Sequence, residues 1–103
     1  MFGERLCMRF NLPDNLLHEI CAYAELRGIR KIILFGSRAR GTHQERSDID
    51  LAVSGGDSLN FYYDLEEKTH TLLMFDIVNL DKEINAELKN EIERDGIVIY
   101  EKV

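Results

Sequence analysis

The chain has little of what several classes of protein require. It contains no tryptophan, one proline and two cysteines in 103 residues, and Cys7 and Cys21 form no Cys-x-x-Cys pair. We therefore expect reduced thiols and neither a disulfide framework nor a zinc site. No apolar run approaches the roughly 20 residues that span a bilayer, and charges interrupt the N-terminal segment where a signal peptide has its apolar stretch. These absences predict a cytoplasmic protein with no membrane segment.

Basic residues are also scarce. The chain has 13 lysines and arginines against 19 aspartates and glutamates, a net charge of −6. Proteins that grip long DNA or RNA without sequence preference are basic, because neutralising phosphates supplies most of their affinity. The charge therefore argues against direct binding of long nucleic acid. A polyanionic ligand would need a metal ion to mediate its contact with this chain.

The residues that are present predict one small globular domain over residues 1–103, because 45% are hydrophobic and 31% are charged. Apolar periodicity and turn residues predict helices over 14–27, 58–70 and 81–95 and strands over 31–35, 48–53, 72–80 and 97–100. Asp81 is expected to cap the last helix and Gly96 to end it. The element order predicts an α/β or α+β fold with a small mixed sheet and helices packed on it.

A glycine–serine pair directly follows the first predicted strand. Gly36 would let a phosphate approach the backbone, since it has no Cβ, and the Ser37 hydroxyl could donate a hydrogen bond to a phosphate oxygen. If Ser37 opens a short helix, the backbone N–H groups there attract an anion. The simpler alternative is that the pair merely ends the strand and that Gly41 closes the turn.

Two aspartates alternate with apolar residues at the start of the second predicted strand. Asp48 and Asp50 share one face of that strand, with backbones roughly 6.5–7 Å apart. Paired catalytic metal ions lie about 3.5–4 Å apart, so two such carboxylates can lean inward and hold them. Alternatively, both carboxylates lie on a solvated face of the sheet.

Asp76 supplies a third carboxylate within an otherwise almost wholly apolar run. A charge in that setting needs a partner, because an uncompensated buried charge is costly. If the two strands pair, Asp76 joins Asp48 and Asp50. The alternative is a salt bridge to one of the arginines.

In combination, Gly36-Ser37, Asp48-Ile49-Asp50 and Asp76 resemble the pattern of the DNA polymerase β-like nucleotidyltransferase superfamily. In that pattern an apolar strand, Gly-Ser, about ten residues, Asp-x-Asp and a later third acid follow one another. The stretches Gly36–Gly41, Ser47–Leu51 and Arg94–Tyr100 resemble the minimal nucleotidyltransferases, or MNT proteins. The resemblance covers roughly residues 14–103.

The resemblance implies a polymerase β-like nucleotidyltransferase fold and an antitoxin that transfers AMP from ATP to a hydroxyl of a HEPN-type helical toxin. It assigns catalysis and two Mg²⁺ ions to Asp48, Asp50 and Asp76, with Asp76 as the base for the acceptor hydroxyl. Gly36, Ser37 and Arg38 are the expected nucleotide-binding residues. Arg38 would contact the phosphates, as Arg40 also could; for both arginines the alternative is ion pairs with Glu45, Asp48 or Asp76 that hold the loop.

The resemblance leaves three functional alternatives. The first is an active protein adenylyltransferase, the second a nucleotide-binding antitoxin that acts by forming a complex without significant catalysis, and the third a small-molecule adenylyltransferase. The size of the chain suggests that a partner protein or a homo-oligomer completes the site. The aromatic group Phe61, Tyr62 and Tyr63 belongs either to the core or to a partner-binding patch.

Overall fold

The computed structural model describes residues 12–102, so the prediction for Cys7 lies outside the described residues. The first element is helix α2 (Asp14–Leu26), which follows Pro13 as sequence patterning predicts. Its buried side chains, Leu16, Leu17, Ile20 and Ala24, recur at helical spacing and form the face that packs inward. Cys21 lies on the same helix and is half-buried. Across residues 12–102, no helix is long and apolar enough to cross a membrane.

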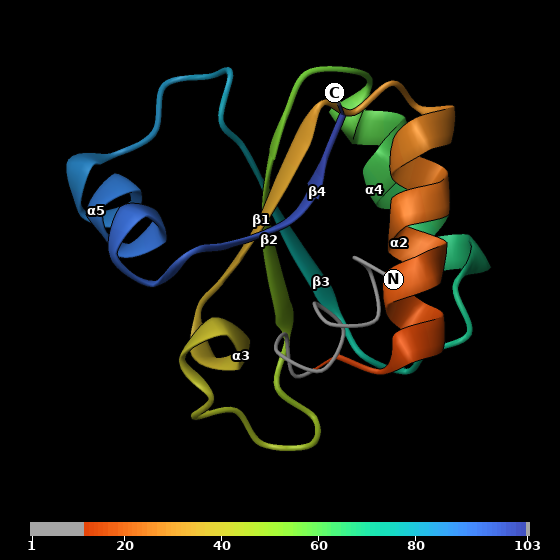
Figure 1. The fold of residues 1–103 in the computed structure, drawn as a ribbon, viewed down its shortest axis with the longest axis horizontal. Helices are drawn as coiled ribbons and strands as arrows, with labels where there is room; N and C mark the ends of the chain where they lie inside the picture. Colours follow the sequence, from red (N-terminus) through yellow and green to blue (C-terminus); the bar gives the residue numbers. More distant parts are fainter. Residues whose placement is uncertain (1–11, 103) are drawn as a thin grey trace.

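A four-stranded mixed sheet forms the centre of the fold (Figure 1). Its strands are β1 (Lys31–Phe35), β2 (Ile49–Ser54), β3 (Phe75–Asn79) and β4 (Ile97–Glu101), in the spatial order β3-β2-β1-β4. The β1 strand is antiparallel to both β2 and β4. Strands β2 and β3 are parallel, because α4 (Ser58–Lys68) carries the chain back between them. This arrangement confirms the predicted mixed sheet.

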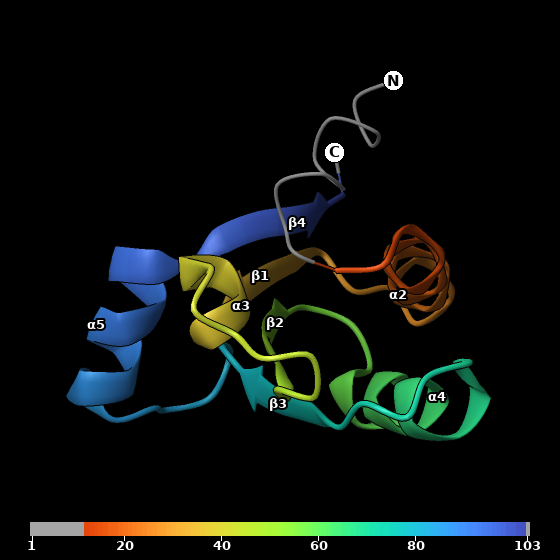
Figure 2. The ribbon, with the colours of Figure 1, turned by 90° about the horizontal axis from the view of Figure 1, so that it is seen from below.

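Helices cover the two faces of the sheet unequally (Figure 2). Helices α2 and α4 lie side by side on one face, where the alternate residues Ile49, Leu51 and Val53 of β2 are fully buried. The other face carries α5 (Ala86–Asp95), whose Ile92 packs in a smaller cluster with Phe35 and Ala52. The part of this second face beside α5 is therefore the place where polar strand residues can meet solvent.

The start of the last helix differs from the prediction. Asp81 does not cap it; Asn85 does, by accepting a hydrogen bond from the Leu88 N–H (2.7 Å), and the helix begins at Ala86. The Asp81 carboxylate instead accepts from the Gly55 N–H (2.6 Å) and from the Ser54 hydroxyl (3.0 Å). Asp81 thus links the turn after β3 to the end of β2 through hydrogen bonds. This is a long-range contact, which the periodicity of a helical sequence cannot predict.

Candidate active site

Asp50 and Asp76 lie directly beside each other on neighbouring strands. Their Cα atoms are register partners in the parallel pairing of β2 with β3, so both side chains project from the same face of the sheet. This face is opposite the buried side chains of Ile49 and Leu51 and is shared with α5. The prediction that Asp76 lies alongside the Asp48–Asp50 segment is thereby confirmed in its backbone geometry.

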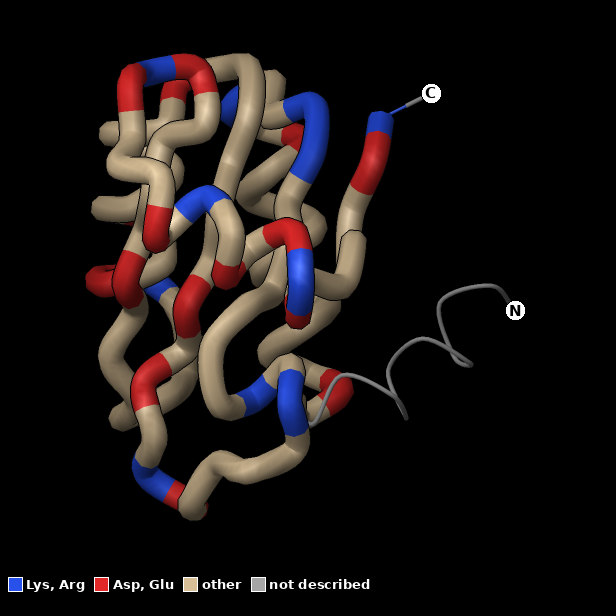
Figure 3. The backbone as a smooth tube through the Cα atoms, turned by 90° about the vertical axis from the view of Figure 1, so that its left-hand side faces the viewer, with Lys and Arg blue, Asp and Glu red and all other residues tan. Residues whose placement is uncertain are grey.

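Asp48 is placed differently from its two companions. Strand β2 begins at Ile49, so Asp48 belongs to the end of the preceding loop, and its side chain is exposed. The negative charge of Asp48 nevertheless raises the pKa of the Asp50 carboxyl. Figure 3 views the side of the molecule that carries α5 and shows several acidic positions along its strands and helix.

The backbone at Gly36 closely approaches the Asp50 carboxylate. Gly36 has φ +75° and precedes the four-residue helix α3 (Ser37–Arg40). A Cβ added at Gly36 would collide with Asp50 Oδ2 and lie 3.1 Å from its Cγ. Both the positive φ and the close approach require glycine here. The Gly36-Ser37 turn and the Asp50 carboxylate of β2 are therefore parts of one local structure.

The Asp50 carboxyl has a strongly raised pKa. Burial raises its pKa from the ordinary 3.8 to about 6, and the negative charges of Asp76, Asp48 and Glu91 add to this rise. Arg40 opposes it. A half-buried carboxyl facing other carboxylates is unfavourable when ionised, unless a cation compensates the charge. Glu91 comes from α5, and no local sequence pattern predicts that it lies near the site.

The donor set suits a hard divalent cation. Carboxylate oxygens are the protein ligands that Mg²⁺ prefers, and the mutual repulsion among Asp48, Asp50 and Asp76 is the type of repulsion that a bound cation removes. Within residues 12–102, however, no three aspartate, glutamate, histidine or cysteine side chains already lie in positions that could together coordinate a metal ion. The residues fit Mg²⁺ by chemistry and by strand register, and their side chains would have to converge on the ion.

Arg38 holds the loop that leads into β2. The residue is buried, with 4% of its surface exposed, and its Nε and Nη2 groups donate hydrogen bonds to the carbonyls of Ser47 and Glu45, both at 3.1 Å. Burial lowers its pKa. These contacts correspond to the loop-holding alternative, although the partners are backbone carbonyls rather than the predicted carboxylates. Contact of Arg38 with a phosphate stays a prediction.

Arg40 links the end of α3 to α5. Its Nη1 lies 3.4 Å from an Asp95 oxygen and 3.8 Å from a Glu91 oxygen. The alternatives drawn from sequence, Glu45, Asp48 and Asp76, are not its ion-pair partners in this structure. The reason is topological: β4 pairs with β1 and brings α5 beside α3, which local patterning could not reveal.

Known proteins resemble this chain in sequence and in fold. Residues 17–103 match the protein family described as polymerase beta nucleotidyltransferase. The chain belongs to this family. A protein of Methanocaldococcus jannaschii named "Putative protein adenylyltransferase" is 36% identical to this nucleotidyltransferase over an 81-residue alignment that covers 70% of this chain and 79% of the relative.

Solved structures also share the fold of this nucleotidyltransferase. A structure described as a toxin–antitoxin with AMP-PNP superposes with a TM-score of 0.65 at 24% identity, over 84% of this chain and 73% of the other. A structure described as the toxin–antitoxin MntA-HepT gives a TM-score of 0.62 at 18% identity, over 87% and 74% of the two chains. At these identities the likeness establishes the polymerase β-like fold.

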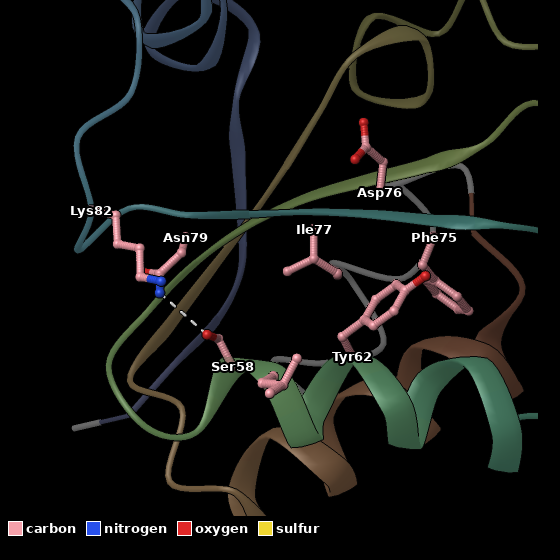
Figure 4. A pocket seen from close by; sticks show the side chains of 8 residues that line it. Ser58, Tyr62, Phe75, Asp76, Ile77, Asn79 and Lys82 are labelled. Atoms are coloured by element: carbon pink, nitrogen blue, oxygen red, sulfur yellow. Dashed lines mark hydrogen bonds between the residues drawn. The ribbon is translucent and has the colours of Figure 1, made fainter.

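The aromatic residues of α4 divide between the two predicted roles. Phe61 is fully buried in the core, whereas 48% of the Tyr63 surface is exposed. Tyr62 is half-buried and lines a cavity of about 420 Å³ between α4 and β3, which Asp76 borders (Figure 4). The nucleotidyltransferase therefore has a cavity beside β3, the edge strand that carries Asp76.

Proposed function

We propose that this nucleotidyltransferase transfers AMP from ATP to a hydroxyl of a partner protein, in a reaction that requires Mg²⁺. The observation that carries the proposal is the register pairing of Asp50 with Asp76 on the open face of the sheet, beside the Gly36 turn on which the Asp50 carboxylate lies. The name of the Methanocaldococcus jannaschii relative supports a protein as the acceptor.

The triphosphate would bind at the Gly-Ser turn. The Ser37 hydroxyl and its backbone N–H, which has no acceptor within α3 because it is the first of the helix, would hold the β- and γ-phosphates. Gly36 lets a phosphate approach without steric obstruction. Arg38 acts here as a positioning residue, since its hydrogen bonds to Ser47 and Glu45 set the path of the loop toward Asp48.

At the α-phosphorus one bond forms and one breaks, and one proton moves from the acceptor hydroxyl to a carboxylate. The acceptor oxygen attacks the α-phosphorus in line, the bond from that phosphorus to the bridging oxygen of the β-phosphate breaks, and pyrophosphate leaves with the bonding electrons. The Asp76 carboxylate, which is exposed on the open face, accepts the proton of the hydroxyl. Asp48, Asp50 and Asp76 would hold two Mg²⁺ ions, which neutralise the triphosphate and lower the pKa of the attacking hydroxyl.

A HEPN-type helical protein is the partner we propose, with this chain as its antitoxin. Fold neighbours of the chain are described as toxin–antitoxin assemblies, one of them with AMP-PNP, which supports both a toxin partner and an adenine nucleotide. The net charge of −6 argues against long nucleic acid as the acceptor. We propose that the pair acts in the cytoplasm, and that the partner or a second copy completes the acceptor side of the site.

The proposal is tested by incubating the purified protein with ATP and Mg²⁺, with and without the product of a neighbouring gene, and by measuring the intact mass of both proteins. A gain of one or more AMP units on the partner, absent in Asp50→Asn, is the expected result. A stable complex with no gain in mass would instead favour the antitoxin that acts by binding alone. Transfer only to small hydroxyl compounds would favour the third alternative.

A further inference from the structure

Strand β3 lies at an edge of the sheet, and half of its backbone hydrogen-bonding groups face away from β2. Two bonds at the ends of this parallel pairing set the alternation: the Ile49 N–H donates to the Met74 carbonyl, and the Leu80 N–H donates to the Val53 carbonyl. Because a parallel ladder uses every second residue, Asp76 directs its backbone groups toward β2. Phe75, Ile77 and Asn79 direct theirs outward.

Some of the outward groups already have partners. The Phe75 N–H donates to a Glu66 carboxylate oxygen (3.2 Å), and the Asn79 carbonyl accepts from the Lys82 N–H (3.3 Å). The Phe75 carbonyl, both backbone groups of Ile77 and the Asn79 N–H have no partner within residues 12–102. An open edge of this kind can pair with an extended segment of another chain.

The side chains of β3 alternate between the two faces of the sheet. Asp76 projects to the open face with Asp50, whereas Phe75 and Ile77 project toward α4 (Figure 4). A segment that pairs with β3 must alternate in the same way. A residue opposite Asp76 would lie on the Asp76 face, with its Cβ roughly 4.5–5.5 Å from that of Asp76, and its two neighbours would point toward α4.

The space that would receive those neighbours is the cavity of about 420 Å³ between β3 and α4. Tyr62 and Leu59 of α4 form an apolar part of its wall, and Ser58 and Lys82 bring polar groups to it. Leu59, which is 62% exposed, and the strand residues Phe75 and Ile77 contribute apolar surface to the same cavity. The cavity is therefore suited to an apolar or aromatic side chain.

We infer that the acceptor binds as an extended polypeptide segment that adds to the open edge of β3. Its hydroxyl-bearing residue faces Asp76, and the residues immediately before and after it enter the cavity lined by Leu59 and Tyr62. This inference rests on the proposed transfer to a protein and specifies how that acceptor is recognised. The selectivity then lies in the two residues that flank the hydroxyl, because the backbone pairing itself is indifferent to sequence.

Three peptide libraries provide the test, each with a central tyrosine, serine or threonine and four randomised positions on either side. They are incubated with the protein, ATP and Mg²⁺, and the modified peptides are sequenced by mass spectrometry. We expect selection for apolar or aromatic residues at the two positions that flank the hydroxyl. Leu59→Asp should lower kcat/KM for selected peptides about tenfold or more through KM, with no change in ATP affinity.

Val98→Asp is the matched control, because Val98 is a partly exposed apolar residue (39%) on the opposite edge strand, β4. It should leave peptide kinetics unchanged. Equal effects of the two variants, or no selection at the flanking positions, would overturn the inference while leaving protein adenylylation intact. Modification of a whole protein but of no peptide would also overturn it. A second copy of the chain bound to the edge of β3 would do the same, and it would be seen without peptide as concentration-dependent shifts of the Ile77 and Asn79 amide resonances. Absence of transfer to any acceptor would contradict the proposed function itself.

Discussion

Asp50→Asn should make the metal-free protein more stable at neutral pH while abolishing transfer. The pKa of Asp50 rises from 3.8 to about 6 in the folded protein, so the folded state holds this proton more tightly than the unfolded state. Ionising Asp50 therefore costs stability, and the cost develops as the pH rises from about 4 to about 6. Below pH 4 the carboxyl is protonated in both states and the cost is absent.

The magnitude follows from the size of that rise. About two pH units correspond to roughly 3 kcal/mol, but the side chain is only half-buried and solvent screens the interaction, so about 1 kcal/mol is a realistic expectation. In a domain of this size, 1 kcal/mol shifts the melting temperature by about 4–8 °C. Asparagine has the shape of aspartate without its charge, so the variant should melt higher by this amount at pH 7.5 without metal.

Thermal melting between pH 4 and pH 8, without metal and with Mg²⁺, measures this effect. The gain of Asp50→Asn should shrink toward zero at pH 4, and Mg²⁺ with ATP should raise the melting temperature of the wild type more than that of the variant. Glu67→Gln, which removes an exposed carboxylate on α4, is the control and should change neither. A variant that is less stable than wild type at pH 7.5 would refute the reasoning that Asp50 is strained by uncompensated charge.

Three further substitutions test the structure around the site. Gly36→Ala should destabilise the fold by about 1–3 kcal/mol and abolish transfer, because the new Cβ meets the Asp50 carboxylate. Gly41→Ala, at φ +79°, is the control for backbone strain and should retain activity. Urea unfolding measures the stability of both variants, and AMP transfer measures their activity. Arg38→Met should cost about 1–3 kcal/mol and speed amide exchange in residues 42–48, whereas Arg40→Met should leave that exchange unchanged; equal exchange in both variants would contradict the loop-holding role of Arg38. Asp64→Asn should cost about 2 kcal/mol in urea unfolding at pH 7, because Asp64 is buried against the Arg27 guanidinium (2.6 Å) and its pKa falls to about 2; that difference should shrink as the pH falls from about 4 through 2, and a difference at pH 2 as large as at pH 7 would refute it.

Local sequence patterns predicted much of the fold. The β1 strand runs from Lys31 to Phe35, as its apolar residues and the following glycine predicted, and Gly96 ends α5. These elements are set by short-range signals, namely apolar periodicity and residues that break regular structure. The helix over residues 81–95 began too early in the prediction, because Asp81 serves a tertiary contact with Ser54 and Gly55.

The sequence predicted the strand carboxylates of the site but not their neighbours from α5, because local patterns do not record tertiary contacts. The carboxylates of Asp48, Asp50 and Asp76 stood out because charges interrupt or alternate with apolar strand residues. Their neighbours from α5, Glu91 and Asp95, did not, since only the pairing of β4 with β1 brings that helix to the site. The cavity beside β3 likewise depends on how α4 packs, which no linear pattern records.

The most direct measurement of the central claim follows the two ends of ATP separately. The protein, its partner and Mg²⁺ are incubated with ATP radiolabelled at either the α- or the γ-phosphate, and the label that remains on the partner protein is counted. Transfer of AMP predicts that the α-label is retained, that the γ-label is released as pyrophosphate, and that Asp76→Asn retains neither. Retention of the γ-label would show phosphoryl transfer instead, and would contradict the role we assign to Asp48, Asp50 and Asp76.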